Sequence, residues 1–146
     1  MDSLDFKILR ELSLNSRLSF RDIARKLNSS TSTVARRVQS MVKRGLIKRF
    51  TTIVNYEKLG LDLFAIIEVV VSGGNLLEIE RELAEDPHVQ SVYDITGQSD
   101  ILILARFKNR KQLSDFVKSV LAMPNVERTI THIVLNVVKE DLNSPL

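Results

Sequence analysis

Apolar residues in the first 45 positions recur every three or four residues, the spacing of the buried face of an amphipathic helix. The pattern predicts helices over residues 4–13 and about 20–27, and a third helix that ends at Gly45. A Ser-x-x-Asp capping box at residues 19–22 marks the second helix, and the polar turn of residues 28–31 precedes the third. Two short helices, a tight turn and a longer helix predict a helix-turn-helix. The apolar positions of the third helix are Val34, Val38, Met41 and Val42.

The residues after Gly45 have the pattern of extended chain. Residues 46–54 combine β-branched and aromatic residues without a helical period, which predicts a wing-like strand that leads into a linker. We therefore expect a winged helix-turn-helix domain at residues 1–50 and a linker strand at residues 51–60.

The second part of the chain, residues 61–146, alternates strand and helix patterns. Runs rich in Ile and Val predict strands at residues 61–72, 89–95, 101–107 and 126–138, with amphipathic helices after the first and third. A Pro-x-Val triplet follows each helix, so a strand-helix-strand unit occurs twice. This βαββαβ order predicts an α+β ferredoxin-like domain, in which two helices cover one face of an antiparallel sheet. Because outward positions of every strand include Ile and Val, the other face is expected to pack against a second copy.

The net charge of +3 conceals a division of charge along the chain. Residues 1–60 hold 13 Lys and Arg against 5 Asp and Glu, a net charge of +8, whereas residues 61–146 hold 8 against 13, a net charge of −5. A basic domain joined to an acidic one predicts that the first domain binds a polyanion and the second does something else.

The third helix carries basic and hydroxyl side chains opposite its apolar stripe, and no acid occurs between Asp22 and Glu57. In a major groove, such side chains contact base edges while flanking cations contact phosphates. A solvated basic surface helix is the alternative, and the preceding turn and two helices argue against it. We expect recognition by Ser30, Ser32, Thr33, Arg36 and Arg37, and phosphate contacts by Lys43, Lys48 and Arg49.

Composition excludes several other classes of protein. There is no Cys and there are only two His, so we expect no disulfide and no metal site. No arrangement of residues suggests catalysis, so the protein is not expected to be an enzyme. We expect His132 to be packed or interfacial and His88 to be exposed in a turn. The apolar run at residues 63–67, which no other run exceeds in length, is too short to span a membrane, and the sequence has no signal-peptide pattern.

Five short motifs follow one another along nearly the whole chain: Leu4-Asp5 with Ile8-Leu9, Arg36-Arg37-Val38, Gly45-Leu46-Ile47, Leu59-Gly60 and Thr96-Gly97-Gln98-Ser99-Asp100. Their order and spacing resemble those of the leucine-responsive and asparagine-regulator (Lrp/AsnC) family of transcription factors. The resemblance implies a winged helix-turn-helix joined to a ferredoxin-like amino-acid-binding module. It also implies assembly as dimers and often octamers, with effectors at interfaces between dimers.

The resemblance further implies that Gly97, Gln98, Ser99 and Asp100 form a ligand loop. Glycine would expose backbone N–H groups to a carboxylate, and Asp100 would pair with an α-ammonium group. From the residues alone, this loop is also typical of a hairpin turn. Further candidates are Tyr93 and the alternating pair Thr129 and Thr131, although Thr is also common in strands.

These expectations describe a cytoplasmic, nucleoid-associated transcriptional regulator that binds specific double-stranded DNA. It would form a homodimer or octamer and respond to an amino acid, with no other cofactor and no membrane. One alternative is a nucleoid-type architectural protein with low sequence specificity. The other is an amino-acid-sensing module that does not bind DNA, against which the +8 charge of residues 1–60 argues.

Overall fold

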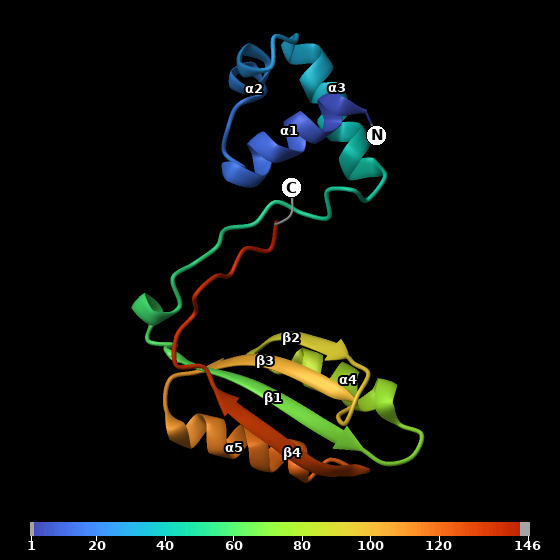
Figure 1. The fold of residues 1–146 in the computed structure, drawn as a ribbon, viewed down its shortest axis with the longest axis vertical. Helices are drawn as coiled ribbons and strands as arrows, with labels where there is room; N and C mark the ends of the chain where they lie inside the picture. Colours follow the sequence, from blue (N-terminus) through green and yellow to red (C-terminus); the bar gives the residue numbers. More distant parts are fainter. Residues whose placement is uncertain (1, 144–146) are drawn as a thin grey trace. The chain divides into compact units, whose positions relative to one another are not determined.

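A computed structural model describes residues 2–143 of the chain (Figure 1). The chain divides into two compact units. The helical unit contains the residues up to Ile53 and those from Lys139 onward, and the sheet unit contains Val54–Val138. Residue 1 and residues 144–146, which the expected domains include, lie outside the described residues.

The helical unit contains the three helices that the apolar spacing predicted. Their inward positions form one core, in which Ile8, Ile23, Val34 and Met41 are fully buried. Each helix begins at a polar residue whose side chain accepts backbone N–H groups of the first turn, as helix N-caps do. The helices are α1 (Ser3–Leu14), α2 (Phe20–Lys26) and α3 (Thr31–Lys43).

Two left-handed residues shape the ends of α2 and α3. Asn28, in the turn between them, has a φ of 50°, a conformation that Asn adopts more readily than most residues. Gly45 has a φ of 72°, and Leu46 N–H donates to Met41 O at 2.9 Å, so the helix ends in a Schellman motif. The prediction for Val42 is wrong. Its side chain is 46% exposed, and the core contains Met41, one position earlier, in its place.

The strand predicted over residues 46–54 and the linker strand over residues 51–60 do not form in the described chain. The only regular element there is the short 3-10 helix η1 (Glu57–Leu59). A strand exists only when another segment accepts and donates its backbone hydrogen bonds, and no described segment pairs with these residues. A composition rich in β-forming residues was therefore not sufficient to make this segment a strand.

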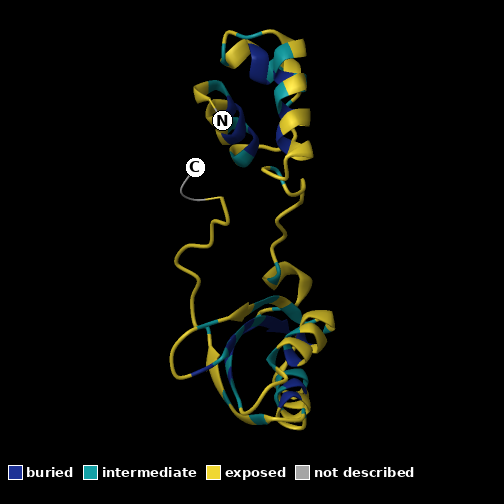
Figure 2. Ribbon diagram, turned by 90° about the vertical axis from the view of Figure 1, so that its right-hand side faces the viewer, coloured by how far each residue is buried: buried dark blue, intermediate teal, exposed yellow. Residues whose placement is uncertain are grey.

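The sheet unit has the predicted βαββαβ order and a four-stranded antiparallel sheet in the order β2-β3-β1-β4. Figure 2 shows both helices on one side of this sheet. The core between them includes Ile67, Ile103, Leu83 and Val120. The bounds are β1 (Leu63–Val71), α4 (Leu76–Glu85), β2 (Val89–Asp94), β3 (Ile101–Phe107), α5 (Arg110–Leu121) and β4 (Val126–Ile133).

The last strand is shorter than predicted. β4 ends at Ile133, and one further backbone hydrogen bond joins Val134 N–H to Phe64 O. Residues 135–138 continue the apolar pattern but extend past the partner strand, so they have no ladder to join.

Candidate DNA-binding and effector-binding sites

The N-terminus of α3 presents three hydroxyl groups in one hydrogen-bonded cluster. Ser30 Oγ accepts the Thr33 N–H at 3.1 Å and donates to Thr33 Oγ1 at 2.8 Å. Ser32 Oγ lies 3.0 Å from Ser30 Oγ. Ser30 is thus the N-cap of the helix, and its hydroxyl fixes the first turn that carries Ser32 and Thr33.

Four of the predicted DNA-contacting cations lie on the surface of the helical unit. Arg36 and Lys43 are exposed on α3, seven residues and therefore about two turns apart. Lys48 and Arg49 are exposed in the segment that follows the helix. None of the four makes an ion pair within residues 2–143, so all four charges are available to an anionic partner.

Arg37 differs from its neighbour Arg36. Its Nη1 lies 2.6 Å from Asp2 Oδ2 and 3.3 Å from Asp5 Oδ1, two carboxylates at the start of α1. The hydrogen bond to Asp2 raises the pKa of Arg37. The pKa of Asp2 is lowered, chiefly because its carboxylate accepts the Asp5 N–H and also because it bonds Arg37. Arg37 therefore has partners inside the protein.

The sheet face opposite the helices, called the open face below, is uncovered in the single chain. Its members follow from the strand register, in which Glu68 is level with Leu102 on β3 and Ile130 on β4. Apart from Glu68, the residues of β1 and β3 at the centre of this face are apolar and half-buried. The open-face residues are Phe64, Ile66, Glu68, Val70, Ser91, Tyr93, Leu102, Leu104, Arg106, Arg128, Ile130 and His132.

One polar cluster interrupts the open face. Glu68 Oε2 accepts the Ser99 hydroxyl at 2.7 Å, and Glu68 Oε1 lies 3.1 Å from His132 Nε2. Hydrogen bonds from Ser99 and then His132 lower the pKa of Glu68. His132 is exposed in this chain, so of the two predicted alternatives, packed or interfacial, it is not packed within one chain, and the interfacial one stays a prediction. The sequence contained one signal for this cluster, which is the lone acid in an otherwise apolar strand.

The loop of residues 97–100 is held firmly against β1. Gly97 has a φ of 130°, which residues with a side chain rarely adopt. The Asp100 carboxylate accepts the Val71 N–H at 2.8 Å through Oδ2, and the Asp100 N–H donates to Val69 O at 3.0 Å. Asp100 therefore satisfies backbone groups of the neighbouring strand, in addition to any ligand contact.

The candidate effector residues divide between the two sides of the sheet. Tyr93 lies on the open face, and Ser99 reaches that face through Glu68. Thr129 and Thr131 are level with Val69 and Ile67, whose side chains face the helices. Within one chain the two threonines therefore do not lie beside Tyr93.

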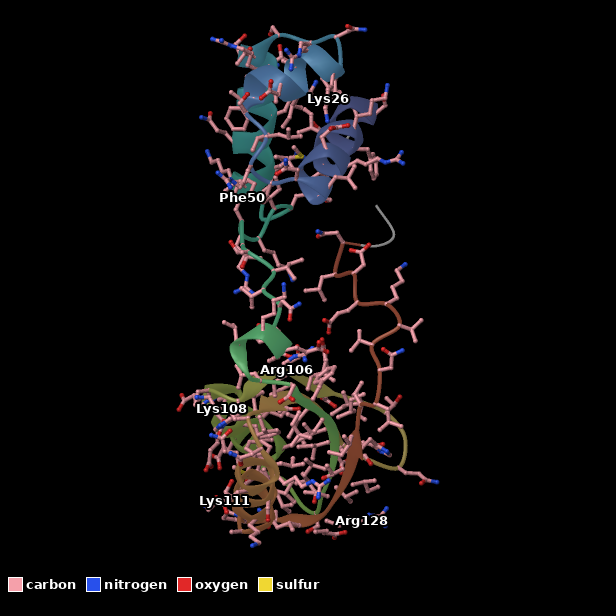
Figure 3. All side chains as sticks on the ribbon, turned by 90° about the vertical axis from the view of Figure 1, so that its left-hand side faces the viewer. Lys26, Phe50, Arg106, Lys108, Lys111 and Arg128 are labelled. Atoms are coloured by element: carbon pink, nitrogen blue, oxygen red, sulfur yellow. The ribbon has the colours of Figure 1, made fainter. Side chains whose placement is uncertain are left out.

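One further side chain differs from expectation, and a second forms a contact that the sequence did not indicate. His88 is half-buried rather than exposed, because its ring stacks on Phe107 at 5.1 Å and Nδ1 lies 2.9 Å from Asp86 Oδ1. Arg106, labelled in Figure 3, is only 8% exposed, and its guanidinium carbon lies 4.1 Å from the centre of the Phe64 ring and 4.8 Å from that of Tyr56. This stack joins the residue before η1 to the open face.

The structure contains no group of three or more His, Asp or Glu among residues 2–143 that could hold a metal ion. Within the same residues, no helix is both long and apolar enough to cross a membrane.

Comparison with known proteins decides the family. Residues 64–143, more than half of the chain, match the Lrp/AsnC ligand binding domain. The chain belongs to the Lrp/AsnC family. Residues 1–48 match a winged helix-turn-helix DNA-binding domain. This Lrp/AsnC protein is therefore a transcriptional regulator with a DNA-binding helix-turn-helix and a ligand-binding domain, and the fold class predicted from the sequence is confirmed.

Relatives of this Lrp/AsnC protein match along almost its whole length. An HTH-type transcriptional regulator of Pyrococcus furiosus is 48% identical over 141 residues, which cover 97% of this chain and 95% of that one. A transcriptional regulator from Neisseria meningitidis, solved as a complex with L-Met, is similar with a TM-score of 0.93 and 26% identity, over 99% of this chain and 96% of that chain. LrpC of Bacillus subtilis has a TM-score of 0.87 and 27% identity, over 95% and 97%.

Proposed function

We propose that this Lrp/AsnC protein is a sequence-specific, nucleoid-associated DNA-binding regulator in the cytoplasm, whose DNA binding or assembly responds to an amino acid. The observation that carries the proposal is the outer face of α3, where Arg36 and Lys43 have no ion pair with a described residue and Ser32 and Thr33 lie at the N-terminal end. Such a face suits the major groove, with Arg36 reading bases and Lys43, Lys48 and Arg49 contacting phosphates.

The open face supports a homodimer. Leu102, Leu104, Ile66 and Val70 are half-buried there, and no helix or strand among residues 2–143 packs on this face. An apolar face of this kind is normally covered by another surface, and two copies related by a two-fold axis would each cover the other. A dimer would bind two half-sites about one helical turn apart. Dimers could assemble further into octamers.

The loop of residues 97–100 supports amino-acid binding. Gly97 leaves the backbone without a side chain, and one oxygen of Asp100 has no hydrogen-bond partner among residues 2–143 while the other accepts the Val71 N–H. The similar Neisseria regulator was solved with L-Met. An amino acid would place its carboxylate on the loop N–H groups and its ammonium group on Asp100. Gln98, Ser99, Tyr93, Thr129 and Thr131 are the other candidates, with the threonines supplied from a different chain.

The DNA-binding proposal is tested by selecting bound fragments from the host genome and measuring affinity for the selected duplex and for a random duplex at matched salt. A sequence-specific regulator binds the selected duplex at least about 1,000-fold more tightly. Affinities within a few-fold of each other would instead support an architectural protein. Absence of binding to either duplex at low salt would support a sensor that does not act on DNA.

The effector proposal requires a substitution that spares the structural role of Asp100. Asp100→Asn keeps an oxygen for the Val71 N–H and removes the charge. Calorimetry across the twenty amino acids should give binding heat with the parent protein and none with Asp100→Asn, while both melt at the same temperature. Identical heats in the two proteins would remove Asp100 from the site.

A further inference from the structure

A buried carboxylate joins the start of α1 to the recognition helix α3. Asp5 is 2% exposed. Its Oδ1 accepts a hydrogen bond from Arg37 Nη1 at 3.3 Å, and its Oδ2 accepts the Asp2 N–H at 3.3 Å and lies 3.9 Å from Arg44 Nη2. A buried carboxylate is costly unless cations and hydrogen bonds surround it. These contacts supply both.

Arg37 is the residue of α3 that makes the two short contacts. The same Nη1 nitrogen contacts both acids, since it lies 3.3 Å from Asp5 Oδ1 and 2.6 Å from Asp2 Oδ2. Asp2 is also the N-cap of α1 and accepts the N–H groups of Leu4 and Asp5. One nitrogen of α3 therefore holds both the cap and the first turn of α1.

The remaining contact between α1 and α3 is apolar. Ile8 and Leu9 of α1 share one core with Val38 and Met41 of α3. Apolar burial has no preferred direction, whereas hydrogen-bonded ion pairs have a fixed geometry. The cluster of Asp2, Asp5 and Arg37 can therefore restrict the rotation of α3 about its own axis more tightly than packing of the apolar core alone. That rotation decides which side chains of α3 face a DNA groove.

Arg36 and Arg37 are adjacent, but only the charge of Arg36 is available to DNA. Arg36 is exposed and has no ion pair within the described chain, whereas Arg37 is half-buried between two acids. Two acids, Asp2 and Asp5, balance two cations, Arg37 and Arg44. The cluster therefore adds no net positive charge to the surface that would face phosphates.

We infer that Arg37 is a positioning residue, which fixes the orientation of α3 through Asp2 and Asp5 while Arg36 contacts the DNA. This inference rests on the proposed DNA-binding function. It replaces the interpretation from sequence, in which both arginines recognise bases.

The test compares full-length variants on the selected duplex across a series of salt concentrations. Arg37→Gln should weaken binding by about tenfold, lower the melting temperature and leave the slope of log affinity against log salt unchanged, because no phosphate contact is lost. Asp5→Asn should act in the same way, and the double variant should be no weaker than either single one. Arg36→Gln should weaken binding without a change in melting temperature. Lys111→Gln serves as the matched control, because it removes a cation from the exposed pair with Asp115 on α5. It should change neither the DNA affinity nor the melting temperature.

A lysine at position 37 separates the two roles even if the glutamine variant does not fold. The lysine ammonium keeps a positive charge for the carboxylates of Asp2 and Asp5, and it lacks the buried Arg37 Nε, which has no hydrogen-bond partner within the described residues. Arg37→Lys should therefore keep its affinity within about fivefold of the parent. A larger loss with normal folding would overturn the inference, because it would reveal a contact specific to the guanidinium group.

Two further results would overturn the inference. They are a salt slope about one unit shallower in Arg37→Gln, and full DNA affinity in a folded Asp5→Asn. Failure of the proposed function would look different, since the parent protein itself would then bind neither duplex, or would bind the selected and random duplexes within a few-fold of each other.

Discussion

The helical unit and the sheet unit differ in how much of their proposed site one chain contains. In the helical unit the candidate DNA-binding face lies on α3 and the segment that follows it, and one chain contains its cap, core and exposed cations. In the sheet unit the candidates lie on both faces of the sheet, and the open face has no cover. A local site of the first kind can be tested one side chain at a time, whereas a site of the second kind must be tested through assembly.

The largest expected effect comes from a charge at the centre of the open face. Leu104→Glu should weaken dimerisation by on the order of 3 to 5 kcal/mol, because the carboxylate would be buried without a partner. Sedimentation velocity should show a monomer with unchanged circular dichroism. Leu77→Glu, at a position 65% exposed on α4, is the control and should remain dimeric. If Leu104→Glu remained a dimer, the open face would not be the dimer interface, and the contrast drawn between the two units would fail.

Removal of a core side chain tests whether the units are stable separately. Met41 is fully buried in the helical unit, and Met41→Ala should lower the free energy of unfolding of that unit by about 2 to 5 kcal/mol. In urea, the transition of the helical unit should move to lower concentration while that of the sheet unit stays in place. Val120→Ala, in the core of the sheet unit, should do the reverse. One shared transition that moves with both variants would show that the units unfold together.

A single exposed side chain should carry a measurable part of DNA binding. Arg36→Ala should weaken binding to the selected duplex by about 1 to 3 kcal/mol without a change in stability. Fluorescence anisotropy with a labelled duplex measures the loss. Arg110→Ala, at the start of α5, is a control of equal charge change outside the helical unit. Equal affinity of Arg36→Ala and the parent would remove Arg36 from the interface.

The cap of α3 should have a smaller effect. Ser30→Ala leaves the Thr33 N–H without its acceptor, so the free energy of unfolding of the helical unit should fall by about 1 kcal/mol. Chemical denaturation measures this change, with the neighbouring Ser29→Ala as the control. If the two variants are equally stable, the hydroxyl of Ser30 does not stabilise the start of α3.

The smallest effect is the acid dependence of the open-face cluster. Because the pKa of Glu68 is lowered in the folded chain, its ionised form stabilises the fold at pH values above the ordinary 4.5, and this contribution is lost as the pH falls through the lowered value. Ser99 and His132 bond Glu68, and Tyr93 and Arg128 share the same face. Glu68→Gln should show a weaker fall in urea midpoint below pH 4.5 than the parent. Parallel curves would assign the acid dependence to other groups.

The strand predictions show where a sequence pattern was sufficient to locate a strand and where it was not. Residues 101–107 were predicted with the observed bounds, because the run is apolar and turn residues flank it. Residues 46–54 have a similar composition and form no strand, since no described segment pairs with them. The pattern describes what a segment prefers, and only a partner makes it a strand.

The site predictions have the same limit. The helical period placed Arg36 outward, which is a local property. It could not show that Arg37 meets Asp5, 32 positions away, or that Asp100 binds the backbone of β1, 29 positions away. The side of a helix on which a residue lies follows from sequence spacing, whereas ion pairs between elements depend on how those elements pack.

The sequence by itself determined the two-part organisation, the three helices, the βαββαβ order, the basic character of the first part and the family resemblance. Each of these follows from residue type and local spacing, which operate within a few turns of chain. The tertiary structure decided that Arg37 is held by two acids, that the candidate effector residues lie on opposite faces of the sheet, and that Glu68 forms a polar cluster on an apolar face. Those facts depend on register and burial, which arise only when distant segments pack together.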